Sequence, residues 1–169
     1  MSETVYILMG SNMGDRDKNL SAALAQLEML PGLEVVAVSG IYISEAEEMP
    51  PDSPAFLNQV VACDYAYLPG ELLNALEAIE KTLGRTGKGQ RQPRTIDLDI
   101  LLFGERIVET ERLSIPHPKL LNRPFAMVPL LQIEPGVVHP VTKSPVAEFL
   151  TDRQRRQVLL YKEYVTRNA

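Results

Sequence analysis

The stretch "PRTIDLDILLF", from Pro93 to Phe103, decides the fold because it places two aspartates inside a run of Ile and Leu. Successive side chains of a β-strand alternate between its two faces, so residues two apart share a face. Asp97 and Asp99 are therefore predicted to point one way, and four apolar side chains the other: Ile96, Leu98, Ile100 and Leu102. Two neighbouring carboxylates repel each other, and burying them is costly unless cations offset their charge. We expect positive charge beside this pair.

The sequence before this stretch predicts three more strands and two helices. Apolar runs indicate strands over Thr4–Gly10, Leu33–Ser44 and Asn58–Tyr67. Leucines at helical spacing, from Leu20 to Leu27, predict a helix that ends before Pro31–Gly32, and those from Leu72 to Leu83 predict a second that ends at Gly84. The order βαββαβ, with the aspartate strand last, is typical of the ferredoxin-like α+β fold. In that fold both helices lie on one face of the sheet.

The last third of the chain predicts a loop-rich C-terminal extension. It is interrupted by seven prolines: Pro116, Pro118, Pro124, Pro129, Pro135, Pro140 and Pro145. The tail "DRQRRQVLLYKEY" is interpreted as a surface helix whose basic residues are solvated. At 169 residues, we expect residues 1–169 to form a single domain.

Composition and charge are those of a soluble globular protein, with 45% hydrophobic and 23% charged residues. The net charge of −5 argues against a broad surface for nucleic acid or for an anionic membrane. The apolar run "VYILM" is too short for a signal peptide or a membrane span. Cys63 is the single cysteine, so no intramolecular disulfide can form, and its predicted strand position indicates a small buried residue. We expect a cytoplasmic enzyme or binding protein.

The aspartate pair predicts a magnesium site. Mg²⁺ is commonly held by one or two carboxylates together with the phosphate oxygens of a substrate. The segment just before the pair is rich in glycine and cations, and its cations are Arg85, Lys88, Arg91 and Arg94. The alternative is a structural ion pair between one aspartate and Arg94. Neither a Walker phosphate loop nor the Rossmann G-x-G-x-x-G spacing is found, so any ATP would bind without those loops.

Three ordered motifs carry a family resemblance: "MGSNMGDRDKNL", "PRTIDLDILLF" and "LSIPHPKLLNRPFAMVPLLQIEP". Together, from about Tyr6 to Pro135, they resemble the 6-hydroxymethyl-7,8-dihydropterin pyrophosphokinases of folate biosynthesis. The resemblance implies a ferredoxin-like enzyme that transfers the β,γ-diphosphate of ATP to the hydroxymethyl group of the pterin. It further implies two Mg²⁺ ions on Asp97 and Asp99.

The resemblance also assigns roles to individual residues. It implies catalytic roles for Arg85 and Arg94 beside the aspartates. It implies an ATP site lined by Arg94, Arg112, Ser114 and His117, and a pterin site lined by Asn58, Phe125 and Phe56. Ordinary structural roles are the alternatives: a solvated Arg112, a turn residue at His117, a core Phe125 and a turn-capping Asn58. His139 matches no residue of the family pattern and is interpreted as structural.

The resemblance implies direct transfer without a covalent enzyme intermediate. We expect the segments Ser44–Pro54 and Gly84–Pro93 to close over the bound substrates. The expected partners are ATP and the pterin, with no nucleic acid and no membrane, and the protein is expected to be a monomer. Two alternatives remain from other classes: a palm-like nucleotidyltransferase, and a non-catalytic RNA-binding or regulatory module on the same fold.

Overall fold

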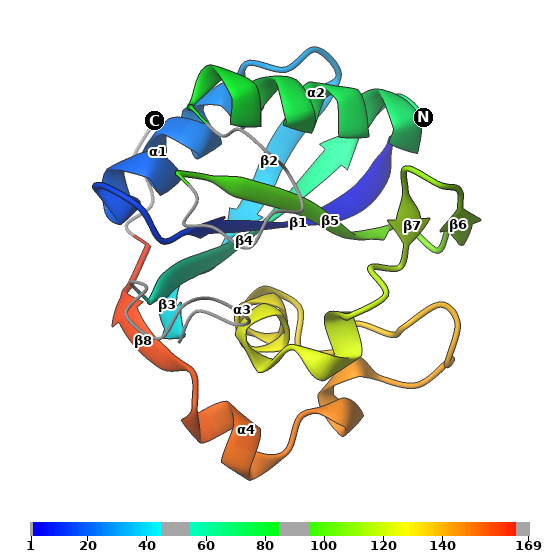
Figure 1. Cartoon of the computed structure of the whole chain (residues 1–169). Helices are drawn as coiled ribbons and strands as arrows, with labels where there is room; N and C mark the ends of the chain where they lie inside the picture. The colour runs from blue at the N-terminus through cyan, green and yellow to red at the C-terminus, as the bar shows by residue number, and fades with distance from the viewer. Residues whose placement is uncertain (1, 45–54, 85–94, 165–169) are drawn as a thin grey trace.

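The computed structural model describes residues 2–44, 55–84 and 95–164 and contains a six-stranded antiparallel sheet with helices on both faces (Figure 1). The strands follow the order β5-β1-β4-β3-β8, and β2 also pairs with β4. Their bounds are β1 Glu3–Ser11, β2 Leu33–Val38, β3 Ile41–Ser44, β4 Phe56–Tyr65, β5 Asp97–Phe103 and β8 Leu159–Lys162. With β2 and β3 together in the place of one strand, the ferredoxin-like order predicted from the sequence is confirmed.

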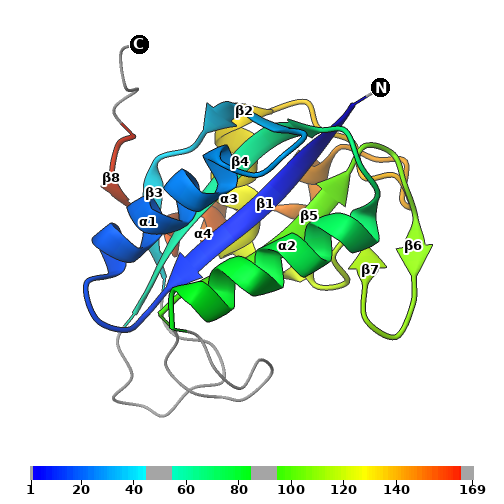
Figure 2. The same cartoon turned by 90° about the horizontal axis from the view of Figure 1, so that it is seen from above.

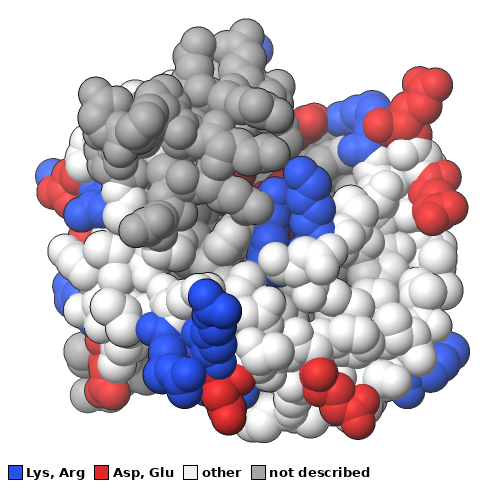
Figure 3. Space-filling model, turned by 60° about the horizontal axis from the view of Figure 1, so that its bottom comes forward, with Lys and Arg blue, Asp and Glu red and all other residues white. Residues whose placement is uncertain are grey.

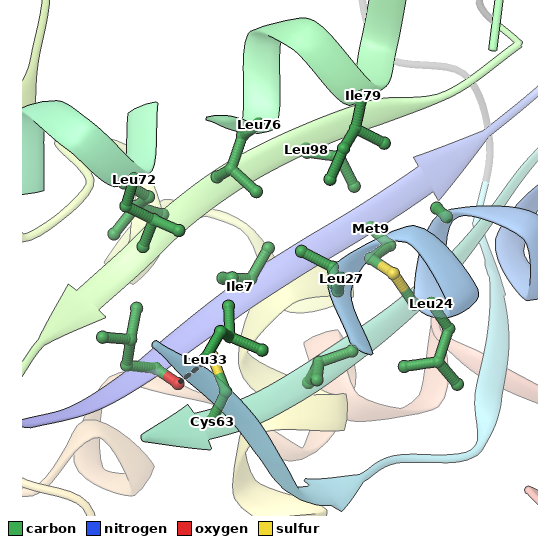
Figure 4. Packing of buried hydrophobic residues seen from close by; sticks show 14 of the residues in the cluster. Ile7, Met9, Leu24, Leu27, Leu33, Cys63, Leu72, Leu76, Ile79 and Leu98 are labelled. Atoms are coloured by element: carbon green, nitrogen blue, oxygen red, sulfur yellow. Dashed lines mark hydrogen bonds between the residues drawn. The ribbon is translucent and has the colours of Figure 1, made fainter. Parts of the chain in front are cut away.

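Both helices of the repeating unit cover one face of the sheet, as predicted (Figure 2). Helix α1, Arg16–Glu28, begins at Asp15, whose side chain accepts a hydrogen bond from the Lys18 backbone N–H at 3.1 Å. Helix α2, Pro69–Thr82, is followed by Gly84 at a φ of +97°, a left-handed conformation that favours glycine. These two helices meet the sheet in one apolar cluster, in which Ile7, Leu27 and Leu76 pack together (Figure 4).

The opposite face of the sheet is covered in part by the C-terminal extension. Helix α3, Pro124–Ile133, packs its buried residues against Leu8, Val60 and Leu102. The rest of the extension consists of short elements: β6 Val108–Glu109, β7 Ser114–Ile115, η1 Leu120–Asn122, η2 Val146–Phe149 and α4 Asp152–Arg156. This loop-rich architecture agrees with the prediction made from the prolines. In the described ranges, no helix has the length and apolar character needed to cross a membrane.

The predicted strand Leu33–Ser44 is wrong as a single element, because β2 and β3 are separated at Ser39 and Gly40. Ser39 is fully buried, and its hydroxyl accepts from the Val60 N–H at 2.9 Å and donates to the Gly40 carbonyl at 2.7 Å. The Gly40 N–H donates to the side-chain oxygen of Gln132 on α3. The Ser39 N–H still donates to the Val60 carbonyl, but side-chain hydrogen bonds replace the other backbone ladder bonds at this point, and both strands pair with β4.

The prediction of a helical tail is confirmed for Asp152–Arg156 but wrong for Leu159–Lys162. Helix α4 ends at Arg156, and Leu159–Lys162 then forms β8 on the open edge of β3. As a strand, this segment forms its backbone hydrogen bonds with β3. A short helix on the surface would have little tertiary packing to stabilise it. The ion pair between Lys162 and Asp17 of α1, at 3.1 Å, ties this strand to the main body.

One side-chain direction in β5 differs from the prediction as well. The ladder between β1 and β5 pairs Ile7 with Ile100 but Tyr6 with Leu102, so one extra residue is inserted at Leu101. Leu102 consequently belongs to the α3 side of the sheet, whereas Leu98 and Ile100 belong to the α1–α2 side. The alternation predicted from the sequence holds up to this irregularity.

Candidate active site

The two aspartates lie at the start of β5, on the face of the sheet that α3 partly covers. Asp97 pairs across the ladder with Gly10, and Asp99 pairs with Leu8, whose side chain packs on the α3 side. Both aspartates are half-buried, while Leu98 between them is buried on the opposite face. The prediction that the carboxylates share a face is therefore confirmed by the register.

Gly10 on β1 joins the aspartates to two of the predicted pterin-binding residues. It pairs with Asp97 on one side and with Asn58 on the other. A methyl group at Gly10 would lie 3.5 Å from the Phe56 ring and 3.7 Å from Asn58 Oδ1. Gly10 therefore has no side chain at the position where Asp97, Asn58 and Phe56 are its neighbours.

Asn58 is held in a fixed orientation. It is buried, and its Nδ2 donates to Ser44 Oγ at 2.8 Å and to the Tyr42 carbonyl at 3.4 Å. Because the amide nitrogen is committed to β3, the amide oxygen is the group that faces the space over Gly10. This arrangement goes beyond the turn-capping alternative for Asn58, since its partners lie on a neighbouring strand.

A cavity of about 460 Å³ lies next to this group, between the end of β3 and the start of α3. Ser44, which accepts the hydrogen bond from Asn58, and Phe125 both line it. The Arg123 guanidinium lies over the Phe125 ring, 5.5 Å from the ring centroid. The described part of the cavity thus combines an aromatic face, a hydroxyl and a nearby cation.

The aspartate strand is anchored to α2 by a buried carboxylate. Glu80 is 3% exposed, and its Oε2 accepts from the Leu98 N–H at 2.8 Å. Strand β5 is at the edge of the sheet, so this N–H has no ladder partner on its outer side. Glu80 therefore fixes the backbone between the two aspartates.

The residues predicted to bind ATP are divided by the structure. Arg112 forms an ion pair with Glu77 at 2.6 Å and donates to Asn74 Oδ1 at 3.0 Å, both on α2. Ser114 and His117 instead line a second cavity, on the side of the C-terminal extension. The His117 N–H donates to the Leu101 carbonyl at 2.9 Å, about 13 Å along β5 from Asp97 at the usual rise per residue.

The two predicted catalytic arginines, Arg85 and Arg94, lie outside the described residues. The same holds for Lys88 and Arg91, and for most of the two segments expected to close over the substrates. Of those segments, the structure describes only Ser44 and Gly84.

The donor set fits a hard cation that is bound together with a substrate. Asp97 and Asp99 are neighbouring carboxylates on one face, beside the space over Gly10. Within residues 2–44, 55–84 and 95–164, no group of three or more His, Cys, Asp or Glu gathers in a way that suits a metal ion. Two carboxylates are enough for Mg²⁺ when phosphate oxygens complete its shell.

Residues 6–135 match the family described as 7,8-dihydro-6-hydroxymethylpterin-pyrophosphokinase. The chain belongs to this family. It is 40% identical over 146 residues to a 2-amino-4-hydroxy-6-hydroxymethyldihydropteridine pyrophosphokinase of Aquifex aeolicus, covering 86% of this chain and 89% of that protein. It is 42% identical over 137 residues to the protein of the same name from Pseudomonas aeruginosa, covering 81% and 84%. The resemblance seen in the sequence is thus confirmed.

Solved structures show the same fold. A structure of an HPPK-DHPS in complex with substrates aligns with a TM-score of 0.69 at 15% identity, and covers 88% of this chain. This chain spans only 43% of that longer protein, and 22% of the folic acid synthesis protein fol1 of Pneumocystis carinii, to which it is 40% identical. The remainder of those proteins has no counterpart in the alignment.

Two site residues escaped the sequence analysis, and each left a signal. Glu80 follows Leu76 by four positions, so it lies on the apolar side of a helix where a carboxylate is unexpected. Arg123 stands directly before the Pro124 that begins α3 and two residues before Phe125. A charged residue on a buried helix face and a cation beside an aromatic are both visible in the sequence once the helices are placed.

Proposed function

We propose that this pyrophosphokinase family member transfers the β,γ-diphosphate of ATP to the hydroxymethyl group of 6-hydroxymethyl-7,8-dihydropterin and releases AMP. The observation that carries the proposal is the family match over residues 6–135, which includes the aspartate pair and every predicted site residue. The aspartate that pairs with Gly10, the fixed amide of Asn58 and the Phe56 ring beside Gly10, with Phe125 on the wall of the nearby cavity, support it, because this set suits a metal–phosphate group next to a planar heterocycle.

Asp97 and Asp99 hold two Mg²⁺ ions in this proposal. Mg²⁺ supplies charge neutralisation on the triphosphate and polarises the transferred phosphorus. The carboxylates set where the β-phosphate lies, and Glu80 keeps their strand in place through the Leu98 N–H. Arg85 and Arg94 neutralise charge on the moving diphosphate, and Arg123 adds a cation at the start of α3.

The pterin lies over Gly10 in this proposal. Asn58 presents its amide oxygen to the N–H groups of the heterocycle, while Phe125 and Phe56 contact its ring. The nucleotide extends along β5 towards Ser114 and His117, with its far end on the α2 side, where Arg112 is located. Binding in this way orients the hydroxyl for in-line attack on the β-phosphorus.

We also propose that the protein acts as a single-domain cytoplasmic monomer without a nucleic-acid partner. In support, both acidic and basic side chains occur among the described residues on the face shown in Figure 3, and much of that described surface is uncharged. The net charge of −5 also disfavours the broad positive potential that a nucleic-acid backbone requires. The family match disfavours both the palm-like nucleotidyltransferase and the RNA-binding module.

The test is to incubate the protein with Mg·ATP and the hydroxymethyl pterin and to measure AMP and pterin diphosphate. Equal amounts of the two products are expected, and no AMP without the pterin. Release of pyrophosphate with incorporation of a nucleotide into a polymer would instead indicate the nucleotidyltransferase. Binding of RNA without turnover would indicate the non-catalytic module.

A further inference from the structure

The motif "MGSNMGDRDKNL", Met9–Leu20, joins the end of β1 to the first turns of α1. Apart from Gly10, none of its residues has been assigned to a substrate above. Its polar side chains bond to the protein itself. Asn19 Nδ2 donates to the Met13 carbonyl at 2.8 Å and to Ser11 Oγ at 3.2 Å. The motif therefore forms a fixed turn at the end of the sheet where β4 begins.

Arg16 reaches from this turn to the start of β4. It is the first residue of α1 and is half-buried, and its guanidinium Nη1 donates to the Ala55 carbonyl at 2.7 Å. Hydrogen bonds from a charged donor are shorter and stronger than those between neutral groups. The two residues lie 39 positions apart in the sequence, so the contact fixes two separate elements relative to each other.

A cation at this position does not help the helix itself. The first turn of an α-helix carries a partial positive charge, which favours acidic side chains and disfavours cations. Asp15 at the N-cap and Asp17 in the first turn meet this preference, whereas Arg16 does not. Its presence there is better explained by the contact with Ala55 than by the stability of α1.

The contact lies where the ladder between β1 and β4 ends. The last pair of that ladder is Ser11 with Leu57. Just beyond it, Phe56 still pairs with β3 on one side. On the other side, Arg16 holds the adjacent Ala55 through its carbonyl. The start of β4 is therefore held from both sides, by a backbone ladder and by a side chain.

Phe56 is the residue on which this contact acts. Its ring lies beside Gly10, where an added methyl group would be 3.5 Å from Cδ1 and 3.8 Å from Cε1. A shift of Ala55 would reach Phe56 through a single peptide unit. Asn58 lies two residues further along and is held by its own hydrogen bonds to β3. Loss of the Arg16 contact should therefore disturb the ring more than the amide.

We propose that Arg16 is a positioning residue for the pterin: by holding the Ala55 carbonyl, it sets the Phe56 ring at the place where the heterocycle lies. This inference rests on the proposed function and adds a residue that does not touch the substrate. The ring contacts a part of the pterin that does not react, so the contact is the same before and during transfer. Loss of Arg16 should weaken pterin binding and leave the transfer rate unchanged.

Steady-state kinetics of three variants test this expectation. Arg16→Met removes the donor but keeps an unbranched apolar stem, so packing changes little. Its KM for the pterin should rise about tenfold, the low end for a hydrogen bond from a charged group, while kcat and the KM for ATP stay within about twofold. Arg16→Lys keeps a cationic donor and should recover most of the pterin KM. Lys18→Met, the matched control, removes an exposed cation from the same turn of α1 and should change neither KM.

Two further measurements test whether Arg16 acts through Phe56. In protein that already carries Phe56→Leu, Arg16→Met should raise the pterin KM by less than about twofold, because the effects of coupled residues do not add. In proton NMR spectra without substrates, the Phe56 ring current should shift the Gly10 α-protons. Arg16→Met should move these signals towards their positions in Phe56→Leu. If Arg16→Met does not fold, Arg16→Gln, which keeps a neutral donor, takes its place.

An unchanged pterin KM together with unchanged Gly10 signals in Arg16→Met would overturn the proposal. So would a loss of stability alone, since Arg16 would then only support the fold. An equal rise of the pterin KM in Lys18→Met would overturn it as well, because charge and not contact would be the cause. Failure of the proposed function is recognised separately, since the unmodified protein would then form no AMP from Mg·ATP and the pterin. That result would overturn the pterin role of Arg16, whereas the Gly10 signals would still report its contact with β4.

Discussion

The face of the sheet towards α3 has two halves that differ in chemistry but share the same strands. In one half, Leu8, Val60 and Leu102 are buried under α3. In the other half, two positions away on β1 and β4 and five on β5, the same face carries Gly10, Asn58 and Asp97. The same strands pair through both halves, apart from the extra residue at Leu101, so the two halves differ mainly in their side chains.

This difference separates stability from function along a single strand. Apolar residues in the covered half contribute burial, and their periodicity is that of any sheet with a covered face. The open half gains no stability from apolar burial, and repulsion between its paired carboxylates lowers the free energy of unfolding. Residues kept at such a cost are best explained by a ligand, which here is the proposed Mg·ATP with the pterin.

The largest expected effect is on turnover, from removing a charge in the open half. Asp97→Asn or Asp99→Asn should lower kcat by roughly a hundredfold or more, because the metal ligand loses its charge. The free energy of unfolding should stay the same or rise as the repulsion is relieved. Steady-state kinetics and denaturant unfolding measure the two effects.

Asp64→Asn is the matched control for this prediction. Asp64 is a half-buried carboxylate on β4, and its Oδ1 accepts from Thr4 Oγ1 at 3.3 Å near the other end of the sheet. Its replacement should leave kcat within about twofold, as for surface changes distant from the site. Near-normal turnover of both site variants at saturating Mg²⁺ would contradict the role of the pair.

The covered half should respond in the opposite manner. Leu8→Ala removes a side chain that is 5% exposed and should lower the free energy of unfolding by about 2–5 kcal/mol. At a temperature where the variant remains folded, kcat should be almost unchanged, since Leu8 contacts α3 rather than the proposed ligands. A large loss of kcat without a loss of stability would break the division between the halves.

Glu80 tests whether the backbone of the open half must be fixed from outside. Glu80→Ala leaves the Leu98 N–H without its acceptor, and should cost about 1–3 kcal/mol of stability together with a fall in kcat. Glu80→Gln keeps an acceptor oxygen and should recover much of both. If the alanine variant is less stable but has normal kcat, Glu80 supports the fold and not the position of the aspartates.

The strands and the carboxylate pair were predictable because short-range alternation sets them. The break between β2 and β3 at Ser39–Gly40 was not predictable, because Ser39 and Gly40 form hydrogen bonds with Val60 and Gln132, which are distant in sequence. Strand β8 was missed for the same reason: only the open edge of β3 makes Leu159–Lys162 a strand. The roles of Asn58 and Phe56 came from the family resemblance, and the register with Gly10 adds the reason for their proximity.

The smallest predicted effect concerns pH and lies outside both halves. Burial lowers the pKa of His139, so the folded protein takes up a proton on this imidazole at a lower pH than the unfolded chain, whose pKa is about 6.5. Its contribution to stability is therefore present above that pH and is lost as the pH falls below it. Unfolding measured from pH 7.5 to 5.5 should show a smaller decline for His139→Asn than for the unmodified protein. An equal decline would show that His139 does not report on this burial.

The most direct test of the central claim is to locate the metal on the sheet. Mn²⁺, a paramagnetic substitute for Mg²⁺, added with a non-hydrolysable ATP analogue should broaden NMR signals according to distance. The account predicts the strongest broadening at Asp97–Asp99 and at their partners Gly10 and Leu8, and the least at Tyr65 and Phe103 towards the other end of the sheet. Asp97→Asn should weaken the pattern. Broadening centred elsewhere, or an unchanged pattern in that variant, would contradict the claim that the open half holds the metal.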